Sequence, residues 1–166
     1  MRKILTLLVF SVFILTSCGD DGPPGPPGED GPAGKTYEYD VDFEYFAEEN
    51  LHSAFLEFPE TKISDGVLVY RMAIVQGNVE TWSLIPQNFF LPQGIIQYVY
   101  THTDVDVELI IDGNFDLRNL ANQFTQNQVF RVIIVPSDFQ GLGVDMKNME
   151  DVMNALNLDR DDIIRM

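Results

Sequence analysis

Apolar and polar residues alternate with a period of two along the middle of the chain. In residues 37–45, Tyr, Val or Phe occupies every odd position and Asp or Glu every even one. Successive side chains of a strand point to opposite faces, so this segment predicts a half-buried strand with an acidic outer face. Two other segments are apolar on both faces apart from Arg71 and Arg131 and suit central strands. The predicted strands are 37–45, 52–58, 67–75, 79–85, 95–101, 105–111 and 129–135.

Apolar residues at helical spacing occur in two places, both in the last third of the chain. We expect Asp116 to cap a short helix and Asp145 to cap a second helix near the C-terminus. The methionine-rich stripe of the second helix is expected to pack against the core, in preference to forming a groove for a partner. The two stripes are Leu117, Leu120, Ala121 and Phe124, and Met146, Met149, Val152, Met153 and Leu156.

About seven strands, with helices only as late additions, predict a mainly β fold. The expected architecture is an antiparallel sandwich or roll with one short helix and a C-terminal helix. A parallel α/β sheet is disfavoured because strands and helices do not alternate. Asp112 and Gly113 mark a turn, since glycine accepts a positive φ without a steric penalty.

The first residues have the pattern of a secretory signal. A basic pair precedes an apolar run at 4–15, whose 12 residues would span only ~18 Å as a helix, whereas a membrane crossing needs ~20 residues. Leu15-Thr16-Ser17-Cys18 then resembles the lipobox of bacterial lipoproteins, in which a small residue precedes the cysteine that becomes the mature N-terminus. We expect residues 1–17 to be a signal peptide cleaved after Ser17, and Cys18 to be lipidated.

Glycine occupies every third position from Gly19 to Gly34, and five prolines lie within these triplets. This is the Gly-X-Y signature of collagen, in which only glycine fits at the axis of three polyproline II chains. So few triplets, with acidic pairs among them, favour a single stiff spacer of ~45 to 50 Å over a trimer. We therefore expect 18–34 to be a stalk and 35–166 to be one β-rich domain, as a monomer, with a trimer as the alternative.

The charge and the cysteine content of the chain limit the classes of partner and the bonds that it can form. The chain carries 26 acidic and 10 basic residues, a net charge of −16, which excludes nucleic acid as a partner. Cys18 is the only cysteine, so no disulfide can form within the chain. Asp20-Asp21, directly after the lipobox, is similar to a surface-export signal of some Gram-negative lipoproteins. It favours the outer face of the outer membrane, reached through the N-terminal lipid, over a periplasmic orientation.

Two segments are candidate ligand sites. Asp104, Asp106 and Glu108 alternate with valines and project from one strand face, where they are candidate Ca²⁺ ligands, although a solvated acidic face is the simpler interpretation. The second segment is the predicted loop 86–92 with the tryptophan just upstream, because exposed aromatic rings beside amides can bind a sugar or a peptide. The alternative is that these aromatic residues plug one end of the sandwich. The candidate loop residues are Trp82, Gln87, Asn88, Phe89 and Phe90.

No catalytic constellation stands out, and we predict that the protein is not an enzyme and needs no cofactor. His52 and His102 lie far apart in sequence and the domain lacks cysteine, so a zinc site has little support. Neither Ser53 nor Ser137 lies in a G-x-S-x-G context.

The assembled chain resembles a family of Gram-negative lipoproteins with a collagen-like linker and one small C-terminal domain of uncharacterised function. The resemblance rests on the lipobox, the glycine triplets and several stretches of the domain. Some members are labelled dihydrolipoamide dehydrogenase, an activity that needs a glycine-rich flavin fold and a redox cysteine pair. With Cys18 as its only cysteine, this chain does not fit that activity. The stretches are Val67-Leu68-Val69-Tyr70-Arg71, Leu84-Ile85-Pro86-Gln87-Asn88-Phe89-Phe90, Asp112-Gly113-Asn114-Phe115-Asp116-Leu117 and Asn127-Gln128-Val129-Phe130-Arg131.

The resulting functional hypothesis is a lipid-anchored, surface-displayed module that binds a glycan or protein partner or interacts with the envelope. Two alternatives stay open. One is an extracellular hydrolase with Phe89 and Phe90 at its mouth, which a pocket joining His102 to acidic residues would favour. The other is a structural subunit of an envelope complex, which a large exposed apolar patch would favour.

Overall fold

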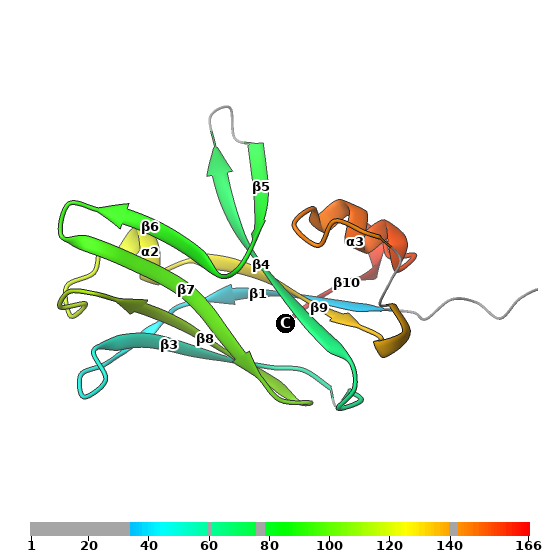
Figure 1. The fold of residues 1–166 in the computed structure, drawn as a ribbon, viewed down its shortest axis with the longest axis horizontal. Coiled ribbons are helices and arrows are strands. Elements are labelled where there is room, and N and C mark those ends of the chain that lie inside the picture. Colours follow the sequence, from blue (N-terminus) through cyan, green and yellow to red (C-terminus); the bar gives the residue numbers. More distant parts are fainter. Residues whose placement is uncertain (1–33, 60, 76–78, 140–142) are drawn as a thin grey trace, which may run out of the picture.

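Two five-stranded sheets packed face to face form a β sandwich, as predicted (Figure 1). The structure is a computed structural model, and it describes residues 34–59, 61–75, 79–139 and 143–166. The predicted signal peptide, the cleavage position Ser17, the lipidated Cys18 and the collagen-like stalk up to residue 33 lie outside the described residues. Within the described ranges, ten strands occur where about seven were expected.

We call the first sheet sheet A. Its strand order is β10-β1-β9-β4-β5, and every neighbouring pair is antiparallel except β1 and β10, which run parallel. The central positions of β4 and β9 agree with their apolar character on both faces. The strands of sheet A are β1 (Lys35–Val41), β4 (Gly66–Val75), β5 (Val79–Leu84), β9 (Gln128–Val135) and β10 (Ile163–Arg165).

Sheet B has the order β2-β3-β8-β7-β6, with every neighbouring pair antiparallel. Sheet B contains β2 (Glu44–Phe46), β3 (Leu51–Glu57), β6 (Gln87–Leu91), β7 (Gly94–His102) and β8 (Asp106–Gly113). The helical elements are α2 (Asn122–Thr125), α3 (Met149–Ala155) and the 3₁₀ segments η2 (Ser137–Phe139) and η3 (Arg160–Asp162). None of the helices in the described part of the chain is long and apolar enough to cross a membrane.

The described residues form two hydrophobic clusters, one on each side of sheet A. The larger cluster fills the space between the sheets and contains Tyr98, Phe130 and Leu117, each no more than 1% exposed. The smaller one lies on the outer face of sheet A beneath α3, where Met149 and Met153 are buried. The prediction that the methionine stripe packs against the core is confirmed.

The predicted strand 37–45 is wrong in one respect, because the structure divides it between the two sheets. β1 ends at Val41 in sheet A, and β2 begins at Glu44 in sheet B. At the crossing, the Asp42 carboxylate accepts the N–H of Asn127, and the N–H of Phe43 donates to a carbonyl in α2. The alternation continues through the crossing because the odd residues on both sides enter the same core.

Both predicted helix caps are also wrong. The Asp116 carboxylate accepts the N–H of Arg118 in a turn, and α2 begins only at Asn122, after Ala121. Asp145 likewise accepts a main-chain N–H in a turn. The cap of α3 is Asn148, whose side chain accepts the N–H groups of the first two acidic residues of the helix. Asp serves both in turns and as a helix cap, so composition does not separate the two roles.

Gly113 does not have the positive φ that was expected of a turn residue, since it belongs to β8. Glycine is required at this position because the neighbouring atoms pack closely around it. A Cβ at this position would lie 2.9 Å from Cδ2 of Leu117 and 3.0 Å from the carbonyl oxygen of Ile95. Glycine is therefore needed where β7, β8 and the buried Leu117 meet.

Candidate functional site

The predicted ligand loop does not form, because its residues make up the strand β6 at the edge of sheet B. Neighbouring side chains in a strand point to opposite faces. Asn88 and Phe90 accordingly face solvent, with Phe90 80% exposed, whereas Phe89 packs against the core and the side-chain oxygen of Gln87 is buried. The four residues thus present no common surface.

Phe89 has the core role that was the alternative interpretation of this segment. Its ring centroid lies 5.7 Å from that of Tyr98 and 5.5 Å from that of Phe124, both in edge-to-face geometry. Trp82, the fifth candidate, belongs to β5 in sheet A. The structure therefore separates Trp82 from the other four candidate residues.

The three candidate Ca²⁺ ligands do not converge either. The Asp106 carboxylate accepts a hydrogen bond of 2.6 Å from the Thr103 hydroxyl, and the Glu108 carboxylate accepts one of 2.7 Å from the Ser53 hydroxyl. Asp104 lies in the turn before β8. Across the described residues, no three His, Cys, Asp or Glu side chains gather as a metal site.

A groove of about 1130 Å³ lies between the outer face of sheet A and the segment from Asp145 to Asp161. In Figure 1 the β4–β5 hairpin extends away from the sandwich, and α3 and β10 lie on one side of this hairpin. The groove residues are Glu80, Trp82, Arg131, Asp145, Lys147, Asn148, Met149, Glu150, Met153, Asn154, Leu158, Asp159, Arg160, Asp161, Ile163 and Arg165.

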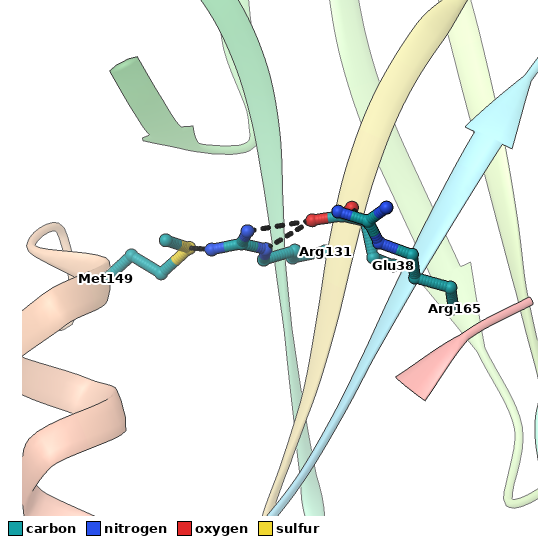
Figure 2. A network of polar contacts seen from close by, with 4 residues as sticks. All are labelled: Glu38, Arg131, Met149 and Arg165. Carbon is teal, nitrogen blue, oxygen red and sulfur yellow. Dashed lines mark hydrogen bonds and ion pairs between the residues drawn. The ribbon is translucent and has the colours of Figure 1, made fainter. Parts of the chain in front are cut away.

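Strand register places three charged residues in one row beside the groove. Glu38 on β1 lies directly opposite Arg131 on β9 and also opposite Arg165 on β10. Oε2 of Glu38 accepts a hydrogen bond of 2.8 Å from Nε of Arg131 and lies 2.8 Å from Nη2 in the ion pair, and Oε1 lies 3.3 Å from Nε of Arg165 (Figure 2). The side chains of Glu38 and Arg131 are only 14% and 13% exposed, whereas that of Arg165 is 84% exposed.

Trp82 and Met149 hold the guanidinium of Arg131 from two further directions. The Cζ atom of Arg131 lies 4.0 Å from the ring centroid of Trp82, which is a cation–π contact. Nη1 lies 3.9 Å from the sulfur of Met149 on α3 (Figure 2). Of the predicted site residues, only Trp82 belongs to this groove. The sequence signal for Arg131 was its position as the one charged residue in an apolar strand.

The groove concentrates the positive charge of a strongly acidic chain. After residue 17 the chain has 8 basic residues, and four of them line the groove. The four are Arg131, Lys147, Arg160 and Arg165. Five carboxylates from Glu80, Asp145, Glu150, Asp159 and Asp161 accompany them, so the groove is nearly balanced in charge where the chain as a whole is not.

Neither histidine belongs to the groove. His52 is buried in sheet B, where its Nε2 lies 2.9 Å from the carbonyl oxygen of Leu117. His102 is exposed at the end of β7, and its Nδ1 lies 3.3 Å from the carbonyl oxygen of Thr103. The groove residues include no His, Cys, Ser, Thr or Tyr. The pocket joining His102 to acidic residues that would favour hydrolysis is therefore not this groove.

A second arginine, Arg71, is buried between the sheets and is 8% exposed. Its Nε and Nη2 donate hydrogen bonds of 3.0 and 2.5 Å to Oε1 of Gln128. Its Cζ lies 4.7 Å from the ring centroid of Tyr98 and 5.3 Å from that of Phe89. Burial raises the pKa of Tyr98 to about 12, although the nearby guanidinium partly opposes this shift. Arg71 thus packs within the core and takes no part in the groove.

Comparison with known proteins adds no relative, since no family model, no curated protein and no solved structure matches the chain.

Proposed function

We propose that the protein is a lipid-anchored lipoprotein displayed on the outer membrane, whose β sandwich binds a ligand in the groove beneath α3. The observation that carries the binding role is the gathering of four of the 8 basic residues around Trp82 in one groove. Concave sites with a few convergent polar groups and an aromatic ring are typical of ligand binding. The lipobox at Cys18 and the glycine triplets support the anchored, stalk-mounted arrangement.

The groove residues favour recognition over catalysis. They supply guanidinium, carboxylate, amide, indole and thioether groups, which recognise ligands by charge, hydrogen bonding and stacking. The hydroxyl and thiol nucleophiles of covalent catalysis, and the imidazole of most general acid–base catalysis, are not among them. A binding module is therefore the best-supported function.

Surface display is tested by the protease sensitivity of an epitope on intact and on permeabilised cells. The exposed turn from Lys62 to Asp65 is a suitable insertion site. The end of the chain is less suitable, because the N–H of Met166 donates to the carbonyl of Glu38 beside the groove. We expect the epitope to be lost on intact cells. Loss only after permeabilisation would place the domain in the periplasm and contradict surface display.

Binding in the groove is tested by hydrogen–deuterium exchange of the full chain in detergent, with and without soluble envelope material. We expect slower exchange in β5 and in the segment 145–165, which together line the groove. Replacing Arg131 by glutamine should abolish this protection. Arg118 is exposed and outside the groove, so Arg118→Gln removes the same charge as a matched control and should retain the protection. Protection confined to other segments would refute the assignment of the groove.

A second candidate function, as a subunit of an envelope complex, is favoured by the end of the β4–β5 hairpin. Ile74, Val75 and Val79 are 66%, 47% and 54% exposed there. Exposed aliphatic side chains that cluster on a projecting element are typical of protein interfaces. Replacing Ile74 and Val79 by threonine should release the protein from a large complex in a gel-filtration experiment on detergent-solubilised membranes. An unchanged elution volume would count against this candidate.

A further inference from the structure

The guanidinium of Arg131 has hydrogen-bond donors on the groove side that meet no oxygen acceptor in the described part of the chain. A guanidinium carries five N–H donors. Glu38 engages Nε and Nη2, and the neighbour of Nη1 is the sulfur of Met149 at 3.9 Å. A thioether is a weak acceptor. A largely buried cation therefore directs strong donors at a weak partner.

The same network has one positive charge in excess. Glu38 supplies one carboxylate to the two guanidiniums of Arg131 and Arg165. Arg165 is 84% exposed and its contact with Glu38 is long, at 3.3 Å, so its remaining donors are accessible to a ligand. Trp82 packs against the guanidinium of Arg131 and fixes its position. The fixed guanidinium of Arg131 and the accessible one of Arg165, which share one carboxylate, are together suited to bind a second carboxylate.

Met149 is buried against sheet A, and its sulfur covers the Nη1 donor of Arg131. Methionine is unbranched and can change its side-chain conformation at low energetic cost. Its contact with Nη1 is made by the sulfur atom. A carboxylate oxygen is a far stronger acceptor for this donor than the thioether. The thioether in Figure 2 thus occupies the place beside Nη1 that a carboxylate oxygen of a ligand would take.

We propose that the ligand is a short peptide or amino acid with a free carboxylate and a free ammonium group, and that its carboxylate binds Arg131 and Arg165 in place of the Met149 sulfur. This inference rests on the proposed binding function of the groove. Five acidic groove residues and the net charge of −16 repel polyanions, so a single carboxylate is favoured. Glu80 and Glu150, which line the groove and are exposed, complement the ammonium group.

The test uses trialanine as the probe and the fluorescence of Trp82, the only tryptophan, as the signal. The full chain in detergent is titrated with the free peptide, its C-terminal amide, its N-acetyl form and acetate alone. Loss of a charge-assisted pair is worth about tenfold in affinity or more. We expect the amide to bind at least about tenfold more weakly than the free peptide, and the N-acetyl form and acetate to bind less tightly as well.

Matched variants assign the effect to the two arginines. Arg165→Gln should bring the affinities of the free peptide and the amide together, whereas Arg118→Gln should keep them apart. Arg165 is exposed, so this variant does not depend on a change in the folded core. Equal binding of the amide and the free peptide in the unmodified protein would overturn the carboxylate assignment. Equal affinities for the N-acetyl peptide and the free peptide would overturn the proposal that the ligand carries a free ammonium group.

Failure of this inference is distinguishable from failure of the binding function. If no probe alters the Trp82 signal while envelope material still slows hydrogen exchange around the groove, the ligand belongs to another chemical class and the zwitterion is refuted. If neither experiment gives a groove-specific effect, the proposed binding function itself is refuted.

Discussion

Replacing Glu38 by glutamine tests how strongly the charged row contributes to the stability of sheet A. The substitution preserves the shape of the side chain but removes the carboxylate whose Oε2 accepts a hydrogen bond from Nε of Arg131 and lies 2.8 Å from its Nη2. It leaves a guanidinium that is only 13% exposed with no carboxylate in its network. Arg165 loses the same carboxylate but is 84% exposed and remains hydrated.

The expected magnitude follows from these different exposures. Breaking a fully buried ion pair on one side costs about 3 to 5 kcal/mol, and an exposed pair contributes about 0 to 1 kcal/mol. The pair of Glu38 and Arg131 is mostly buried but borders an open groove, so we expect Glu38→Gln to lower the free energy of unfolding by about 2 to 3 kcal/mol. Arg165→Gln should lower it by no more than about 0.5 kcal/mol.

Urea unfolding of the full chain in detergent, followed by the fluorescence of Trp82, measures both effects. Trp82 contacts Arg131 directly, so the signal also reports whether the guanidinium keeps its place in the folded state. High salt should reduce the small effect at Arg165 more than the effect at Glu38, because screening acts mainly on exposed charges. A loss below about 0.5 kcal/mol for Glu38→Gln, or an equal loss for Arg165→Gln, would refute the reasoning.

Three further predictions concern the scaffold. Burial raises the pKa of Tyr98 to about 12, whereas the pKa of a tyrosine in the unfolded chain is about 10. The stability that depends on the neutral Tyr98 is therefore fully present below pH ~10 and is lost as the pH rises toward 12. In urea unfolding between pH 8 and 12, the free energy of unfolding should fall by about 2 to 3 kcal/mol less for Tyr98→Phe than for the unmodified protein. Gly113→Ala places a Cβ 2.9 Å from Leu117 and should lower the unfolding free energy by about 1 to 3 kcal/mol, whereas an unchanged urea midpoint would show that the site relaxes freely. Asn148→Ala removes the cap of α3 and should lower the free energy of unfolding by about 1 kcal/mol, with faster hydrogen exchange confined to α3. An equal acceleration of exchange in every strand and helix would contradict this prediction.

The strands were the most predictable part of the fold, because their signal is local. Segments such as 129–135 and 67–75 keep their expected place at the centre of a sheet, since both faces of each are apolar. The missed strands are β2, β6 and β10. β2 continued a pattern already assigned to β1, β6 is bounded by prolines that indicated a loop, and β10 has only three residues.

The candidate site was predictable only through Trp82. Its relation to Arg131 and Glu38 depends on which strands are neighbours, and the two charged residues are 93 positions apart in sequence. The ligand loop was mistaken because alternation along β6 sends adjacent residues to opposite faces. The three carboxylates 104–108 do not converge, because Asp104 lies in a turn and the other two accept hydrogen bonds from different hydroxyl groups.

The sequence alone determined that the domain is mainly β, as an antiparallel sandwich or roll, because burial at every second residue is a property of each segment by itself. It also determined the acidic surface and the excess of carboxylates. Tertiary structure alone decided the order of the strands, the crossing at Asp42 and the row of Arg165, Glu38 and Arg131. Pairing energy depends on contacts between distant segments, so a charge that interrupts an apolar strand has no identifiable partner until the register is set.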